Sequence, residues 1–118
     1  MIDPRTPTTE RLIYLAGPYT GNPMGTTAEF ISVAVTIGTE LRKRGWALVI
    51  PHVNSLPIEG WDLQRYLQED FRILRGCDAL VLLPHWQYSP GTRQEIEFAT
   101  VRGIPVYDYR ALLPDWKG

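Results

Sequence analysis

The sequence contains little of what membrane or disulfide-stabilised proteins depend on. It has a single cysteine, Cys77, so no intramolecular disulfide can form. Its apolar runs are far shorter than the ~20 residues that cross a bilayer, and its N-terminus has no apolar stretch of the kind that directs secretion. We therefore expect a cytoplasmic protein that does not enter membranes.

An excess of charge is also missing. The formal net charge is −1, and the one compact basic cluster, at residues 42–44, falls where a helix is expected to end. Cations near a helix C-terminus interact favourably with the helix dipole, so this cluster does not require a polyanionic partner. We expect a small-molecule partner and no nucleic acid polymer.

What the sequence does contain is an alternation of short apolar runs and amphipathic segments. Residues 1–10 are rich in Pro and Thr without periodicity, which predicts a flexible N-terminal arm before a single domain over residues 11–118, with the core beginning at Arg11. The patterns predict strands over 12–16, 46–50, 79–83 and 104–107, and helices over 26–45, 61–75 and 90–102. Such alternation implies an α/β protein whose parallel sheet is covered on both faces.

Three loops follow the expected strands, at residues 17–25, 52–60 and 84–89. Ligands of open parallel sheets bind beyond the carboxyl ends of the strands, so we expect the site among these loops. The first loop carries Gly17 and Gly21, but its spacing matches neither the dinucleotide fingerprint nor the P-loop. A nicotinamide cofactor or an NTPase is not supported. The loop is either an ordinary turn or a source of backbone amides and the Thr20 hydroxyl for a sugar or phosphate.

Three carboxylates stand out in the expected helices. Asp70 lies seven residues after Leu63 and four before Leu74, which places it on an apolar stripe. Its carboxylate is either held at a functional site, or it lies partly exposed at the edge of the stripe or accepts hydrogen bonds from a neighbouring backbone. Glu95 and Glu97 are two residues apart and point to nearly opposite sides of a helix, so they cannot both serve one site. Periodicity does not choose between them.

Ser89, Pro90 and Gly91 have the pattern of a helix start. Serine is a good N-cap, proline suits the first helical position, and glycine lets a ligand approach the amides at the positive helix end. The triplet either binds an anion or merely caps the helix. Three aromatic residues in or beside the expected site loops, Trp61, Trp86 and Tyr88, either stack on a flat heterocycle or cover the core.

Metal binding finds little support. His52 and His85 both follow expected strands, but neither has a suitably spaced carboxylate or cysteine partner. Cys77 precedes an apolar strand and is most simply a small core residue. We expect neither a metal nor another cofactor.

Three segments, taken in their order and spacing, resemble the nucleoside 2-deoxyribosyltransferase superfamily, in particular a small branch common in phages and bacteria. They are residues 14–21 (YLAGPYTG), 70–78 (DFRILRGCD) and 89–99 (SPGTRQEIEFA). The resemblance runs from about residue 11 to residue 107. It implies a flavodoxin-like three-layer sandwich with a parallel sheet of four to five strands, and a homo-oligomer.

The resemblance also implies roles for individual residues. It makes Glu95, rather than Glu97, the catalytic nucleophile, and Asp70 the second catalytic carboxylate. Substrate-binding positions are expected in the same segments and in the loop before the last helix, at Tyr14, Gly17, Tyr19, Thr20, Trp86, Ser89 and Gly91.

The chemistry that the resemblance implies is double displacement at an anomeric carbon, in which Glu95 attacks, the base leaves, and water or a second base resolves the glycosyl ester. A Ser-x-Gly before the glutamate is similar to the 5′-phosphate-binding segment of the 2′-deoxynucleoside 5′-phosphate N-hydrolases. We therefore expect an N-glycosidase that hydrolyses the base–sugar bond of a (deoxy)nucleoside 5′-monophosphate. The alternatives are a nucleoside 2-deoxyribosyltransferase that exchanges bases and a non-catalytic nucleotide-binding module.

Overall fold

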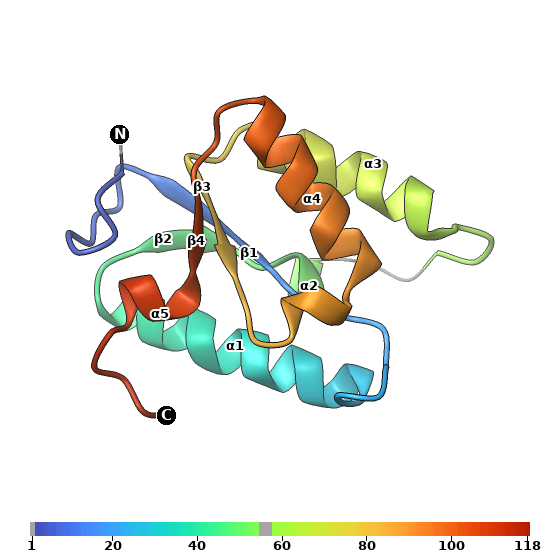
Figure 1. The fold of residues 1–118 in the computed structure, drawn as a ribbon, viewed down its shortest axis with the longest axis horizontal. Helices are drawn as coiled ribbons and strands as arrows, with labels where there is room; N and C mark the ends of the chain where they lie inside the picture. Colours follow the sequence, from blue (N-terminus) through green and yellow to red (C-terminus); the bar gives the residue numbers. More distant parts are fainter. Residues whose placement is uncertain (1, 55–57) are drawn as a thin grey trace.

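A computed structural model describes residues 2–54 and 58–118, which form a parallel sheet with helices on both faces (Figure 1). The strands lie in the order β2-β1-β3-β4, and each neighbouring pair is parallel. Their bounds are β1 Leu12–Ala16, β2 Ala47–Val49, β3 Ala79–Leu82 and β4 Val106–Asp108. The helices are α1 Thr27–Lys43, α2 Pro51–Asn54, α3 Leu63–Leu74, α4 Pro90–Val101 and α5 Tyr109–Leu112, and a 3₁₀ turn, η1, covers Trp86–Tyr88.

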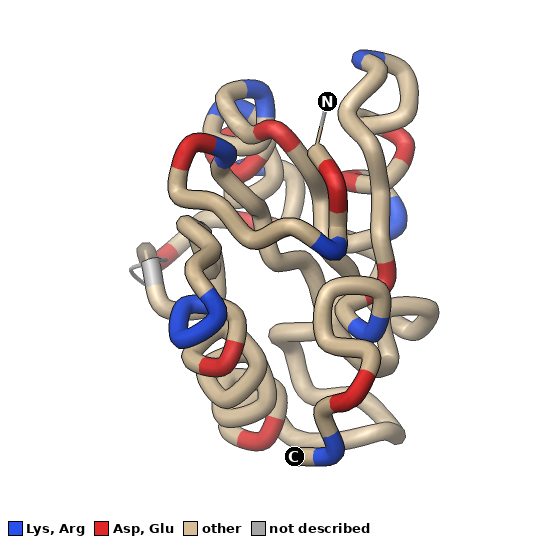
Figure 2. Tube along the Cα trace, turned by 90° about the vertical axis from the view of Figure 1, so that its left-hand side faces the viewer, with Lys and Arg blue, Asp and Glu red and all other residues tan. Residues whose placement is uncertain are grey.

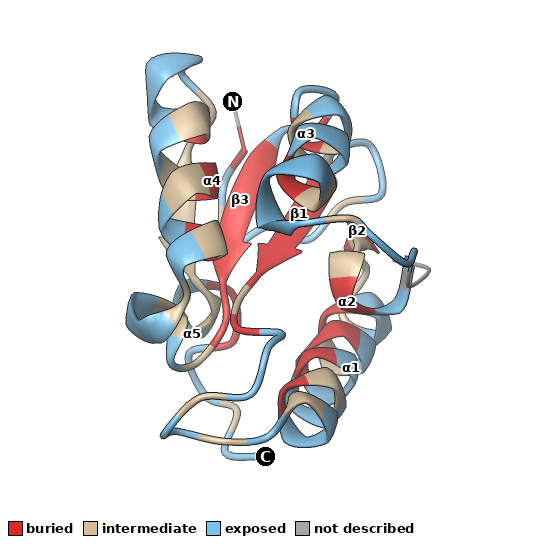
Figure 3. Ribbon diagram, turned by 90° about the vertical axis from the view of Figure 1, so that its right-hand side faces the viewer, coloured by how far each residue is buried: buried red, intermediate tan, exposed pale blue. Residues whose placement is uncertain are grey.

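The two central strands, β1 and β3, divide the core into two halves. Successive strand residues point to opposite faces of a sheet, so Ile13 and Leu15 pack with α1 and α5, whereas Tyr14 and Ala16 pack with α3 and α4. Figure 3 shows both strands buried between helices whose outer sides are exposed. The predicted α/β class and the flavodoxin-like three-layer sandwich are confirmed.

The predicted strands and long helices are confirmed to within a few residues at their ends. Residues 52–54, expected to belong to a loop over 52–60, instead form the short helix α2 with Pro51, because the fixed φ of proline suits the first helical position. Residues 55–57 of that expected loop lie outside the described residues.

The N-terminal segment contributes to the core. Ile2 is 6% exposed and belongs to the cluster on the α1 side of the sheet. The Tyr107 hydroxyl donates a hydrogen bond to the Ile2 carbonyl oxygen at 3.3 Å. The expectation that the core begins at Arg11 is therefore wrong, since a single apolar residue among prolines and threonines carries no periodic signal. None of the described helices combines the length and apolar character needed to cross a bilayer.

The order of the strands creates a switch point between β1 and β3. The chain leaves β1 through α1 to reach β2 on one side, and β3 lies on the other side, so the loops diverge above the carboxyl ends of β1 and β3. Gly17 is the first residue after β1, and a Cβ added there would lie 2.7 Å from the Leu83 Cβ. The Leu83 side chain thus leaves no room for a Cβ at position 17, which gives Gly17 a packing role at the floor of this region.

Replacing Gly17 with alanine should destabilise the fold by about 1–3 kcal/mol, because the added methyl group would crowd the Leu83 Cβ, which cannot rotate away as the far end of a side chain could. Gly91→Ala is the matched control, since its added Cβ would meet its nearest neighbour, the Leu63 Cδ1, at 3.5 Å. Alanine also favours a helix over glycine, so Gly91→Ala should be neutral or slightly stabilising. Urea denaturation of the two variants tests this, and equal stability of both would contradict the packing role.

Candidate active site

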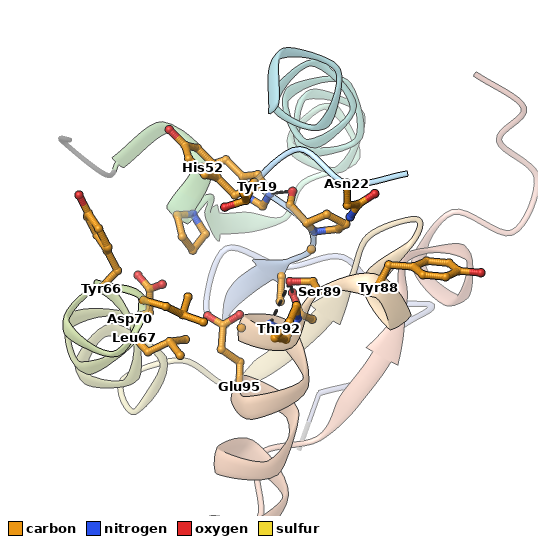
Figure 4. A pocket seen from close by; sticks show the side chains of 18 of the residues that line it. Tyr19, Asn22, His52, Tyr66, Leu67, Asp70, Tyr88, Ser89, Thr92 and Glu95 are labelled. Carbon is orange, nitrogen blue, oxygen red and sulfur yellow. Dashed lines mark hydrogen bonds between the residues drawn. The ribbon is translucent and has the colours of Figure 1, made fainter. Parts of the chain in front are cut away.

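A cavity of about 540 Å³ opens at the carboxyl ends of β1 and β3, where the switch point lies. This size is typical of small-molecule sites. Its walls come from the loop after β1, from α2, from α3, and from the start of α4 (Figure 4). The lining residues are Leu15, Ala16, Gly17, Pro18, Tyr19, Thr20, Gly21, Asn22, Pro51, His52, Leu63, Tyr66, Leu67, Asp70, Tyr88, Ser89, Pro90, Gly91, Thr92 and Glu95.

Glu95 is the most deeply buried carboxylate that lines this cavity. It projects from the buried side of α4 and is 6% exposed, and it accepts a hydrogen bond from the Tyr14 hydroxyl of β1. Burial raises the pKa of Glu95 to about 8, the Tyr14 hydrogen bond lowers it in part, and the charge of Asp70 raises it further. Burial and the neighbouring carboxylates raise the pKa of Tyr14, so its hydroxyl stays protonated and remains a donor.

Asp70 faces the same cavity from α3 (Figure 4). Partial burial, with a smaller contribution from the charge of Glu69, raises the pKa of Asp70 to about 6. At pH 7 the carboxyl of Asp70 is therefore mostly ionised and that of Glu95 mostly protonated. Two carboxyls of different proton affinity at one cavity are the usual basis of acid and nucleophile pairs.

The geometry distinguishes the two glutamates that periodicity left equivalent. Glu97 is exposed on the outer side of α4, whereas Glu95 is buried and lines the cavity. The distinction depends on which face of α4 packs on the sheet: Ala99, one turn after Glu95, is buried in the core cluster that contains Tyr14.

Ser89 is the N-cap of α4 and lies at the cavity. Its Oγ accepts hydrogen bonds from the Thr92 backbone N–H at 3.2 Å and from the Thr92 hydroxyl at 2.9 Å. Gly91 borders the cavity near Leu63 and Leu67 of α3. The prediction that Ser89 caps the helix is confirmed. The cavity in front of the triplet leaves room for a ligand group.

His52 is a site residue that sequence reasoning considered only as a metal ligand. It is 7% exposed, and its Nε2 lies 2.7 Å from the Pro18 carbonyl oxygen, which can only accept, so Nε2 carries the proton. Burial lowers the pKa of His52, and the Pro18 carbonyl offsets this only in part, so the ring is neutral. Its Nδ1 is then a buried acceptor without a protein partner among the described residues. A histidine directly after a strand-ending proline was the available signal.

Of the other expected site residues, the structure places most at the cavity and one away from it. Tyr19 and Thr20 line the cavity together with Gly17, and Tyr14 reaches it through Glu95. Trp86 is not among the residues that line the cavity; it packs against the core cluster on the α3 and α4 side of the sheet and borders a separate hollow near Asp108. Tyr88, two residues later, occupies the position at the cavity instead.

The charges around the cavity are unequal. Its lining includes two carboxyls, and neither lysine nor arginine appears among the described residues that form its walls. Figure 2 shows basic and acidic residues interspersed along the chain. In residues 2–54 and 58–118, no three His, Cys, Asp or Glu side chains gather as a metal site. The cavity therefore offers neutral hydrogen-bonding groups and carboxyls to a ligand.

The fold and the site define an α/β protein with a cavity at the switch point of a flavodoxin-like sheet. The sequence matches a family model described as "Domain of unknown function (DUF4406)" over residues 11–108, so the chain belongs to this family. None of the curated proteins matches the sequence.

Replacing Glu95 with glutamine should stabilise the protein increasingly as pH rises. The folded-state pKa of about 8 exceeds the ordinary value of 4.5, so between these values the folded protein holds a proton that the unfolded chain has released. Folded stability therefore falls as pH rises from 4.5 to 8, by up to about 1.4 kcal/mol per pH unit. Glutamine resembles the protonated carboxyl and avoids this loss.

Thermal unfolding of wild type and Glu95→Gln at pH 4.5, 6.5 and 8.5 tests this expectation. The exposed Glu97→Gln on the same helix is the control and should leave the pH dependence unchanged. A constant difference between Glu95→Gln and wild type at all three pH values would contradict the raised pKa.

Proposed function

We propose that the protein is an N-glycosidase that hydrolyses the base–sugar bond of a (deoxy)nucleoside 5′-monophosphate, with Glu95 as the nucleophile. The observation that carries this proposal is a buried glutamate held by Tyr14 at a cavity that it shares with Asp70. The DUF4406 family is itself nucleoside 2-deoxyribosyltransferase-like, which supports the same class of bond.

In the proposed first step, a Glu95 carboxylate oxygen bonds to C1′ as the C1′–N bond breaks. The bonding electron pair leaves with the base, which takes a proton from Asp70. In the second step, water adds to C1′, the bond from C1′ to Glu95 breaks, and its electron pair returns to the carboxylate while the water proton passes to Asp70. The products are the free base and a sugar 5-phosphate, and both carboxyls end as they began.

These roles require a proton to move before attack. In the free protein at pH 7 the proton is on Glu95, while Asp70 is ionised. Transfer of this proton from Glu95 to Asp70 creates the nucleophile and the acid together. The active form thus carries one proton over the pair, and the pH dependence of the reaction belongs to the pair rather than to either residue.

The dimensions of α4 favour a sugar phosphate between its first turn and Glu95. Ser89 precedes Glu95 by six residues, which corresponds to about 9 Å along a helix at 1.5 Å per residue. In Figure 4, Asp70 and Tyr66 lie on one side of Glu95, and Ser89 and Tyr88 lie on the other. We assign the base to the Asp70 side and the phosphate to the Ser89 side, where the helix N-terminus favours an anion.

Incubation with a panel of nucleoside and deoxynucleoside 5′-monophosphates should release free base, measured by chromatography. Glu95→Ala should lose at least about 10³-fold of the activity, because it removes the group that forms the covalent intermediate. Glu97→Ala should retain it, since this residue is exposed on the same helix.

The same assay distinguishes the alternatives. Base exchange that exceeds hydrolysis when a second base is added would identify a transferase. Ligand binding without turnover, unchanged in Glu95→Ala, would identify a binding module and overturn the proposal.

The pH profile should report the shared proton. We expect kcat/KM to be bell-shaped with limbs near the pKa values of about 6 and about 8. Tyr14→Phe should move the alkaline limb upward, because the Tyr14 hydrogen bond lowers the pKa of Glu95. Asp70→Asn should abolish the alkaline decline, leaving a slower reaction that rises with pH. A wild-type profile that rises without a maximum would show that Asp70 supplies no proton.

A further inference from the structure

The α3 wall of the cavity combines a negative charge with an aromatic ring. Asp70 and Tyr66 are four residues apart, so they are neighbours on the same side of α3, and both line the cavity. Figure 4 shows them together on one side of Glu95. Burial raises the pKa of Asp70 only to about 6, so its carboxyl is mostly ionised at pH 7. This end of the cavity therefore presents a carboxylate next to an aromatic ring.

The Tyr66 ring is held in place by its neighbours. Its hydroxyl accepts a hydrogen bond from the Ile58 backbone N–H at 3.0 Å and donates one to the Ile58 carbonyl oxygen at 3.3 Å. The Trp61 ring meets it edge to face, with the two ring centroids 5.3 Å apart. Because the ring is already fixed, little conformational freedom is lost when a ligand stacks on it.

The positive charges near this wall do not neutralise it. Residues 58–70 contain four acidic residues and one arginine. That arginine, Arg65, is exposed, and its guanidinium lies 4.4 Å from the centroid of the Trp61 ring. No lysine or arginine is among the described residues that line the cavity, and none of the ion pairs in the described part of the chain involves Asp70. A cation in a ligand would meet a carboxylate and an aromatic ring, and both attract cations.

We infer that the site takes a nucleotide whose base carries a fixed positive charge, such as an N-alkylated purine or a pyridinium ring, with the charged ring against Tyr66 and Asp70. The inference rests on the proposed function and names its class of substrate. A cationic base also offsets part of the negative charge that a phosphate ester brings into a cavity lined by carboxyls.

A cationic base also changes the proton balance of the proposed reaction. After Glu95 has passed its proton to Asp70, its carboxylate oxygen bonds to C1′ as the C1′–N bond breaks. The electron pair of that bond neutralises the base, which leaves without taking a proton. A positive charge nearby lowers the pKa of a carboxyl, so the bound base itself favours the ionised form of Glu95.

The second step restores both carboxyls. Asp70 first releases its proton to solvent and then accepts one from the water that adds to C1′. The bond from C1′ to Glu95 breaks, its electron pair returns to the carboxylate, and the proton on Asp70 returns to Glu95. The net reaction turns a cationic nucleotide and water into a neutral base, a sugar 5-phosphate and one proton in solution.

The test compares nicotinamide mononucleotide with its reduced form, which has nearly the same shape but an uncharged ring. Their affinities are measured by calorimetry at pH 7 with the full chain carrying Glu95→Gln, in which no covalent intermediate can form. We expect the charged form to bind about 10-fold more tightly. A second pair, 7-methylguanosine 5′-monophosphate and guanosine 5′-monophosphate at pH 6.5, distinguishes a purine from a pyridinium. A preference within one pair only would support the inference and identify the ring system.

Further variants in the Glu95→Gln background separate the two contributions. Asp70→Asn keeps the shape of the side chain but removes its charge, and it should reduce the preference to about 2-fold or less. Tyr66→Leu should reduce it about 3-fold, whereas Tyr66→Phe keeps the ring and should retain it. The exposed Glu69→Gln on the same helix is the control and should leave the preference nearly unchanged. Thermal unfolding confirms that each variant is folded, and Asp70→Asn decides if Tyr66→Leu is not.

Equal affinities within both pairs would overturn the inference, as would a preference that Asp70→Asn leaves unchanged. Either result leaves the proposed hydrolysis intact if wild type releases base from monophosphates with uncharged bases. Conversely, the expected preference without base release from any nucleotide would overturn the proposed hydrolysis and leave the selection of a cationic ring intact.

Discussion

The hydrogen bond from Tyr14 to Glu95 connects the centre of the sheet to the helix that carries the site. Tyr14 is fully buried in β1, and Glu95 is buried in α4. A buried carboxyl without a partner costs several kcal/mol, and it is tolerated when it is protonated or hydrogen-bonded. The contact therefore fixes the position of α4 on the sheet and gives Glu95 one defined orientation at the cavity, so the fold and the chemistry depend on the same pair.

One helix supplies both ends of the proposed site. The first turn of α4 carries the Ser89 cap and the buried Thr92, and the next turn carries Glu95. Because a helix is rigid over this length, the distance between the two ends is set by sequence spacing rather than by loop conformation. Asp70 comes from the neighbouring helix α3, which packs against α4 on the same face of the sheet. Loops add the remaining walls, and these can vary without disturbing the spacing.

The sequence predicted the fold well because its strands are nearly continuous apolar runs. The apolar runs at residues 12–16 and 79–83 predicted buried strands, and their alternation with amphipathic segments predicted the layers; that these two strands are the central ones is known only from the structure. Ile2 was missed because one buried residue has no period. The site was predicted less well. Trp86 was assigned to the cavity from its place in a loop, but the left-handed backbone at His85, with φ of 65°, begins a 3₁₀ turn that brings Tyr88 to the cavity instead. His52 and Thr92 were overlooked as cavity residues because their importance depends on which atoms already have partners.

The raised pKa of Glu95 becomes understandable once the ligand is considered to be an anion. Two ionised carboxyls in a cavity without a lysine or arginine among its described walls would repel a phosphate ester, and the low polarity of the surroundings would strengthen that repulsion. With Glu95 protonated, the cavity carries one negative charge fewer when the ligand binds. A bound phosphate then raises the pKa of Glu95 further, so losing its proton to solvent becomes harder. Transfer of the proton to Asp70 leaves the total charge of the cavity unchanged and avoids this difficulty. In the proposed reaction, the same burial that makes Glu95 a poor nucleophile in the free protein would therefore allow an anionic substrate to approach it.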